Sequence, residues 1–190
     1  MDNCIEISKI HFRSIFVQKI KEFYDKESRL LNADLGERAL VFRIGCRLYN
    51  AFDGYSVYCE YNKAHGDNEI TSKSIPGKIH TYPDLIIFSD TETGSAANKI
   101  VVEVKKETNC DKLKNDVDKL RWFTDPSYKY RYETGYHLIL GKLYFILCLY
   151  ERGQLISIDK YDKISDQWNS SHAENFIYIN VKDLIGAQYE

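Results

Sequence analysis

The sequence lacks several patterns that would assign it to a particular class of protein. Its five cysteines are scattered and include no CxxC pair, so neither zinc-ligand spacing nor a disulfide framework is expected. The amino terminus has no basic stretch followed by an apolar core, which argues against a secretory signal. The most apolar run, residues 143–150, is far shorter than the roughly 20 residues that cross a bilayer. These absences predict a cytoplasmic protein with no membrane contact.

An excess of basic residues is also missing, because the formal net charge is −2. Proteins that coat nucleic acid are usually basic overall, so any such contact must come from a local patch, an oligomer or a partner subunit. The content of 44% apolar and 28% charged residues is typical of globular proteins. With 190 residues and no internal repeat or linker, the chain is predicted to form a single domain.

Helix-type and strand-type segments alternate along the chain. Apolar residues recur at helical spacing in residues 8–25, 35–51 and 110–123. Runs rich in β-branched and aromatic residues predict strands in 55–62, 82–88, 98–106, 135–140, 143–150, 155–159 and 175–181. The polar segment 63–80, with two glycines and one proline, predicts a surface loop. This order predicts an α/β domain with a mixed sheet flanked by helices.

Three ionisable residues interrupt two of the apolar strands: Asp84 in "YPDLIIF", and Glu103 and Lys105 in "IVVEVKK". Side chains alternate across a strand, so Glu103 and Lys105 project from the same face. If the two strands form an antiparallel hairpin with Phe88 opposite Lys99, then Asp84 lies opposite Glu103. Residues directly opposite one another share a face, with Cβ atoms about 4.5 to 5.5 Å apart. A shift in register by one residue would separate the two carboxyl groups.

Two opposed carboxylates destabilise a sheet unless a cation lies between them. Mg²⁺, or Mn²⁺ in its place, suits such a position, because it is commonly held by one or two carboxylates together with water and substrate phosphates. Lys105 would then hold a metal-bound water or stabilise charge on a phosphate oxygen. The alternative is structural, with Asp84 in a turn at the start of a strand and the other two residues on a solvated face.

The segments "PDLIIF" and "VVEVKK", after a helix containing "GERALVFRIG", resemble the PD-(D/E)XK nuclease superfamily, which has the restriction-endonuclease-like fold. The predicted order helix, strand, strand, strand, helix, strand in residues 34–141 is similar to that family's core. The resemblance implies that Asp84 is the motif aspartate, Glu103 the acidic residue of its second half and Lys105 its lysine. It also implies Mg²⁺-dependent hydrolysis of phosphodiester bonds in DNA, in some cases by a homodimer.

Glu37 is a further candidate metal ligand and catalytic residue. Some branches of the family, among them archaeal Holliday-junction resolvases, carry a glutamate near the start of the first core helix, and Glu37 in "GERAL" matches that position. The resemblance implies that Glu37 assists the metal or the attacking water. The residues alone also fit a capping box, in which Asp34 caps the helix and Glu37 reaches back to the amide of the cap.

Lysines near the motif are predicted to contact DNA: Lys78 in the loop before it, Lys106 at its end and Lys119 in the following helix. Lys63 and Lys73 lie in the same loop as Lys78 and extend the predicted contact. A solvated strand or helix face is the alternative for Lys106 and Lys119.

The helix 110–123 and the segment after it leave further alternatives open. Asp116 lies on the polar face of this helix, either near the site or in solvent. Residues 128–137 interleave tyrosines with basic residues, which suits base stacking but also a polar strand edge, and the edge is favoured. The acidic charge balance also fits a catalytically inactive domain that binds nucleic acid or protein, and a nuclease for RNA is a third interpretation.

Overall fold

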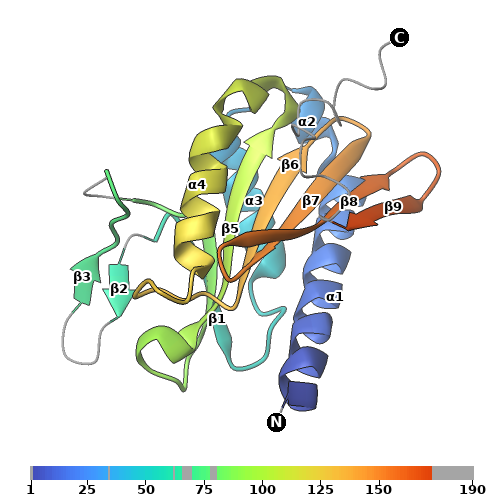
Figure 1. The fold of residues 1–190 in the computed structure, drawn as a ribbon. Helices are drawn as coiled ribbons and strands as arrows, with labels where there is room; N and C mark the ends of the chain where they lie inside the picture. Colours follow the sequence, from blue (N-terminus) through green and yellow to red (C-terminus); the bar gives the residue numbers. More distant parts are fainter. Residues whose placement is uncertain (1, 34, 62, 66–69, 78–80, 173–190) are drawn as a thin grey trace.

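A seven-stranded mixed β-sheet forms the centre of the computed structural model, which describes residues 2–33, 35–61, 63–65, 70–77 and 81–172. From one edge to the other its strands are β1 (Tyr55–Cys59), β4 (Leu85–Ser89), β5 (Asn98–Lys106), β6 (Thr134–Leu140), β7 (Tyr144–Glu151), β8 (Gln154–Asp162) and β9 (Gln167–His172). Neighbouring strands are antiparallel except β5 and β6, which are parallel and connected through helix α4 (Figure 1).

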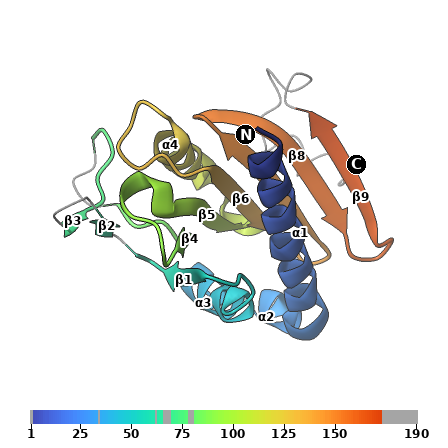
Figure 2. The ribbon, with the colours of Figure 1, turned by 90° about the horizontal axis from the view of Figure 1, so that it is seen from below.

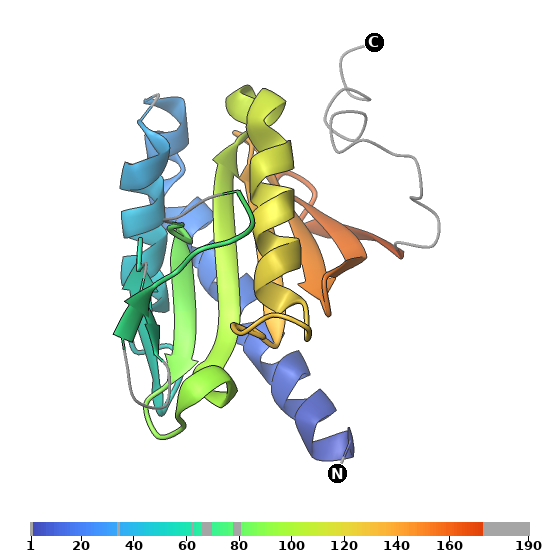
Figure 3. The same cartoon turned by 60° about the vertical axis from the view of Figure 1, so that its left-hand side comes forward.

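Helices cover both faces of this sheet. They are α1 (Asp2–Glu27), α2 (Arg29–Asn32), α3 (Glu37–Leu48) and α4 (Leu113–Thr124), with the 3-10 segments η1 (Gly94–Ala97) and η2 (Glu107–Lys112). Helices α3 and α4 lie on opposite sides of β4 and β5 (Figure 3). A smaller antiparallel pair, β2 (Lys63–His65) and β3 (Ile70–Ser72), lies apart from the main sheet (Figure 2). The arrangement has three layers, with the sheet in the middle.

The structure confirms the three predicted helices and the predicted strands as far as residue 162. The loop expected over residues 63–80 is wrong in part, because β2 and β3 form a hairpin there. Strand β9 was not predicted, since its sequence "QWNSSH" lacks an apolar alternation. The predicted strand 175–181 lies outside the described residues.

Two apolar cores lie on the two faces of the sheet. On one face, α1 and α3 pack against alternate residues of the central strands, including Leu85, Val102 and Val104. On the other face, α4 packs with Leu120 and Phe123 against a second set of strand residues and tyrosines. Because strand side chains alternate between these faces, every second residue of β5 faces α4.

The register between β4 and β5 decides which residues can meet across the sheet. Ile86 pairs with Val101, as the predicted hairpin requires. An irregularity between Ile87 and Phe88 then shifts the ladder, so that Phe88 pairs with Asn98 and not with Lys99. The predicted register is therefore confirmed on the side of the acidic residues and wrong beyond the bulge.

Gly45 allows α3 to approach the sheet closely. A Cβ atom at this position would lie 2.6 Å from Cys59 Sγ and 3.2 Å from Leu85 Cδ2. Gly45→Ala is therefore expected to lower the free energy of unfolding by about 1–2 kcal/mol, since overpacking outweighs the gain in helix propensity. Urea unfolding measures the change.

The matched control places the same substitution in a Cys59→Ala background, where the nearest obstacle is gone. Most of the loss should disappear in that background. An equal loss in both backgrounds would show that contact with Cys59 is not the cause.

Candidate functional site

Charged side chains from four elements meet between the sheet and α4. Glu103 and Lys105 project from β5 on the face away from the core under α3. Asp84 immediately precedes β4, and the pairing of Leu85 with Val102 brings it beside Glu103. Helix α4 adds Asp116 and Lys119, and the start of α3 adds Glu37. The predicted residues Glu37, Asp84, Glu103 and Lys105 are thus brought into one cluster, which we call the acidic cluster together with Asp116 and Lys119.

Glu103 lies at the centre of the acidic cluster and is fully buried. Its Oε2 atom accepts a charge-assisted hydrogen bond from Lys119 Nζ, whereas Oε1 is buried without a hydrogen-bond partner. Burial raises the pKa of Glu103 well above its usual range, and the charge of Asp84 raises it further, while Lys119 opposes the rise. The single lysine does not fully compensate this carboxylate.

Asp84 is partly buried and has a structural contact. Its Oδ2 atom accepts a hydrogen bond of 2.7 Å from the backbone amide of Val104, beyond the last ladder pair of β4 and β5. Burial raises the pKa of Asp84 to about 6, although this hydrogen bond and the charge of Lys119 act in the opposite direction. Asp84 therefore anchors β5 through the amide of Val104.

The charge of Asp84 raises the pKa of Glu103, so the two carboxyl groups lie close to one another. The structural alternative of a solvated strand face is wrong for Glu103 and Lys105, which are 0% and 8% exposed. Burial of charge without full compensation is costly, and such sites are often functional.

Lys105 lies between two carboxylates. Its Nζ atom is 2.9 Å from Asp116 Oδ2 and 3.3 Å from Glu37 Oε2. Burial alone would lower the pKa of Lys105, but Asp116 and Glu37 outweigh it and raise the pKa. Lys105 is thus held as a cation in a fixed position within the acidic cluster.

Glu37 is the first residue of α3, and its contacts differ from those of a capping box. The N-cap is Gly36, with no side-chain cap, so the prediction that Asp34 caps this helix is wrong; residue 34 itself lies outside the described residues. Glu37 Oε1 instead accepts hydrogen bonds from the amide of Lys106 at 3.1 Å and from Asn109 Nδ2 at 2.8 Å. Burial raises the pKa of Glu37, but these donors and Lys105 lower it overall.

Sequence reasoning missed His137 and left Asp116 undecided. His137 is fully buried, pairs with Glu103 in the parallel ladder of β5 and β6, and has its Nε2 atom 3.8 Å from Asp116 Oδ2. Burial lowers the pKa of His137 to about 4, so the imidazole is neutral at pH 7. The signal was present in the sequence, because His137 interrupts the apolar strand "GYHLIL" as Glu103 interrupts "IVVEVKK".

The predicted DNA-contacting lysines have different surroundings. Lys119 belongs to the acidic cluster, and Lys106 is 9% exposed with its Nζ atom 3.2 Å from the carbonyl oxygen of Leu35. Lys73 is 1% exposed and donates to the carbonyl oxygen of Tyr61, so the prediction that it contacts substrate is wrong. Lys78 and the side chain of Lys63 lie outside the described residues.

Three of the four tyrosines in the segment 128–137 are buried. Tyr130, Tyr132 and Tyr136 are each 2% exposed and belong to the two cores. The Tyr130 hydroxyl donates to the carbonyl oxygen of Ser74 and accepts from its amide, which fastens the segment after β3 to the α4 side of the protein. A stacking surface and a polar edge are therefore both wrong for these three tyrosines, whereas Tyr128 is half-buried against the ring of Trp122.

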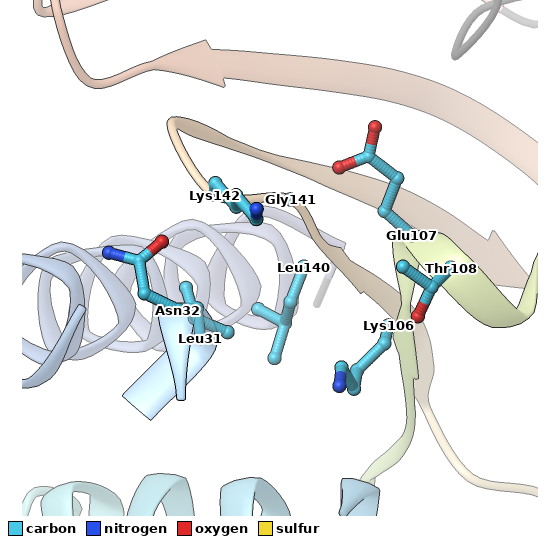
Figure 4. Close-up of a pocket in the computed structure, with 8 residues that line it drawn as sticks. All are labelled: Leu31, Asn32, Lys106, Glu107, Thr108, Leu140, Gly141 and Lys142. Carbon is cyan, nitrogen blue, oxygen red and sulfur yellow. The ribbon is translucent and has the colours of Figure 1, made fainter. Parts of the chain in front are cut away.

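A pocket of about 290 Å³ adjoins the acidic cluster where β5 and β6 end. Its walls come from α2, the end of β5 and the β6–β7 turn, and include Leu31, Asn32, Lys106, Glu107, Thr108, Leu140, Gly141 and Lys142 (Figure 4). The carboxylate of Glu107 and the ammonium of Lys106 point in different directions in this view. Lys142 is exposed, so it is the cation of this pocket that solvent reaches most readily.

The acidic cluster contains oxygen atoms of the kind that bind divalent cations. Asp84 and Glu103 supply hard oxygen donors, both have raised pKa values, and Glu103 Oε1 has no hydrogen-bond partner. Two carboxylates, completed by water and phosphate, are a common set for Mg²⁺. In this structure Lys119 donates a hydrogen bond to Glu103. Among the described residues, no group of three or more His, Cys, Asp or Glu side chains is arranged to hold a metal.

Comparisons of the chain with protein families, curated proteins and solved structures give no match. The described part of the chain also contains no helix with the length and apolar character needed to cross a membrane. The interpretation of the acidic cluster therefore depends on its geometry, its electrostatics and the sequence motif.

The raised pKa of Asp84 predicts a pH-dependent effect of Asp84→Asn on stability. Folding raises this pKa from 3.8 to about 6, so the native state binds a proton that the unfolded state has lost in this window. The free energy of unfolding of the wild type therefore falls as the pH rises through the window, by about 2–3 kcal/mol. Asparagine does not titrate, so Asp84→Asn should gain stability relative to the wild type between pH 4 and pH 7.5.

Urea unfolding at both pH values, with a chelator present, measures this difference. Asp53→Asn serves as the control, because Asp53 is exposed and lies outside the acidic cluster. The same effect of Asp84→Asn at both pH values would contradict the prediction.

Proposed function

We propose that this chain is a metal-dependent nuclease that hydrolyses phosphodiester bonds in DNA. The observation that carries the proposal is the pair of the partly buried Asp84 and the fully buried Glu103, in which Glu103 Oε1 has no hydrogen-bond partner and Lys105 lies on the same face of β5 as Glu103. Burying carboxylates without full compensation costs stability, and a bound cation would offset this cost. This arrangement supports the motif resemblance seen in the sequence.

The order of elements also supports the proposal. The chain runs α3, β1, β4, β5, α4, β6, with β1, β4 and β5 antiparallel and β6 parallel to β5. This is the order of helix, three strands, helix and strand that the resemblance implies for a restriction-endonuclease-like core. Glu103 and Lys105 lie on β5 and Asp84 immediately precedes β4, and these are the two middle strands of the four.

Each residue has a role in the proposed reaction. Asp84 and Glu103 would hold Mg²⁺ or Mn²⁺, which supplies Lewis-acid stabilisation of the phosphate charge when bound. Lys105, fixed by Glu37 and Asp116, would orient the attacking water and stabilise charge on the phosphate oxygen. Glu37 acts through Lys105 and the amide of Lys106, so it is a positioning residue in this arrangement.

Cleavage assays with purified protein test the proposal. The wild type, given Mg²⁺ or Mn²⁺ and linear, circular and branched DNA, is expected to cleave at least one of these forms. Asp84→Ala should lower the rate at least about 100-fold, since it removes a metal ligand. Asp53→Ala, an exposed carboxylate elsewhere on the protein, should retain full activity. Equal cleavage by the wild type and Asp84→Ala would refute the proposal.

A catalytically inactive binding domain is the second candidate function. The observation that favours it is that Lys105 and Lys119 are both already paired with carboxylates, which closes the acidic cluster without a metal. Calorimetry distinguishes the two functions. A wild type that binds neither Mg²⁺ nor Mn²⁺ and cleaves no DNA or RNA, but binds nucleic acid, would support the binding domain.

The pocket at the end of β5 predicts where the DNA backbone passes. Lys142 is exposed and lines the same pocket as Lys106, and a phosphate could reach it without rearrangement of a buried ion pair. Lys142→Ala is expected to weaken DNA binding about 3- to 10-fold at low salt and to reduce the slope of log K against log salt by about one. Fluorescence anisotropy over a salt series measures both quantities.

Lys129→Ala is the matched control. Lys129 is also exposed, but it lies before β6, whereas Lys142 follows this strand at its other end. Identical salt slopes for Lys142→Ala and the wild type would exclude Lys142 from the DNA contact.

A further inference from the structure

We propose that Lys119 is a built-in counter-cation, which neutralises the carboxylates of the acidic cluster in the metal-free protein and withdraws when a divalent metal binds. This inference rests on the proposed function and adds a role for a residue of α4 that the motif does not include. Lys119 would thereby set the affinity of the site for metal.

The surroundings of the Lys119 ammonium group consist of oxygen atoms from three parts of the chain. Lys119 Nζ donates to Glu103 Oε2 on β5 and lies 3.4 Å from the carbonyl oxygen of Tyr82, just before the motif. Asp116 Oδ1, one turn earlier on α4, lies 3.7 Å away. Asp84 also interacts with it electrostatically. Oxygen donors of this kind are the ligands that Mg²⁺ takes.

The carboxylate of Glu103 cannot bind the Lys119 ammonium group and a divalent metal equally well at the same time. Lys119 uses Glu103 Oε2, while Glu103 Oε1 is buried without a hydrogen-bond partner and is therefore available to a further cation. A divalent ion between Asp84 and Glu103 would lie close to the ammonium and repel it. Binding of metal and retention of Lys119 at Glu103 therefore oppose each other.

Asp116 offers the displaced ammonium group a second partner. It lies three residues before Lys119 on the same helix, so the two side chains are neighbours on one face of α4. The flexible four-carbon stem of a lysine allows its ammonium group to move from Glu103 toward Asp116 without movement of the helix. Lys105 stays bound to Asp116 and Glu37 in either state, because its contacts do not include Glu103.

The first test compares Lys119→Met with the wild type by calorimetric titration of Mn²⁺. Removing the competing charge is expected to tighten metal binding at least tenfold, since a nearby positive charge repels the metal. The metal-free variant should also unfold at a lower temperature than the wild type, and Mn²⁺ should restore more of its stability. Lys114→Met is the matched control, because Lys114 is exposed on the same helix and should leave the affinity unchanged.

The second test uses the wild type, so it does not depend on the folding of a variant. Acetylation of lysines with and without Mn²⁺, followed by mass spectrometry of peptides, measures how accessible each ammonium group is. Mn²⁺ should increase the rate of labelling at Lys119 several-fold relative to Lys114. A decreased or unchanged rate would overturn the inference.

The outcomes separate this inference from the proposed function. If the wild type binds Mn²⁺ and Lys119→Met binds it equally or more weakly, Lys119 is not a competing counter-cation, although the nuclease proposal stands. If the wild type binds no metal at all, both proposals are overturned. Tighter binding by Lys119→Met together with faster labelling of Lys119 in the wild type would support the inference.

Discussion

The buried carboxyl group of Glu103 is the constraint on which the rest of the structure depends. An ionised carboxylate removed from water needs a cation and hydrogen-bond donors, and Lys119 provides a cation and one donor from the facing helix, while Glu103 Oε1 has no hydrogen-bond partner. Because α4 is also the crossover between β5 and β6, this ion pair joins the connecting helix to β5. The contact that neutralises Glu103 therefore also fixes the position of α4 on the sheet.

Strand β5 combines two opposite environments along nine residues. Val102 and Val104 belong to the apolar core under α1 and α3, whereas Glu103 and Lys105 belong to the acidic cluster. The apolar face stabilises the strand and holds it rigidly, which allows the opposite face to keep charges that would otherwise favour unfolding. The same kinds of oxygen atom suit an ammonium group or a divalent metal. The proposed nuclease activity would therefore require a metal at Glu103 in place of the ion pair with Lys119.

Local patterns in the sequence were sufficient for a large part of this arrangement. The bounds of β5 follow from its β-branched residues, and strict alternation along it predicts that Glu103 and Lys105 share a face. The pairing of Ile86 with Val101 agrees with the assumed hairpin register, although Phe88 pairs with Asn98 and not with Lys99. Alternation depends on the strand alone, so periodicity predicts it, whereas the bulge that shifts the register is not visible in the sequence pattern.

The sequence by itself therefore determined the three longer helices, most strands as far as residue 162 and the face of β5 that carries Glu103 and Lys105. Only the tertiary structure decided the partners: Lys73 is buried with its ammonium group at the carbonyl oxygen of Tyr61, Gly36 replaces the expected helix cap, and His137 lies beside Glu103. The physical reason is that alternation and helical spacing specify the direction of a side chain relative to its own element. Which side chain it meets depends on the packing of segments that lie far apart in the sequence.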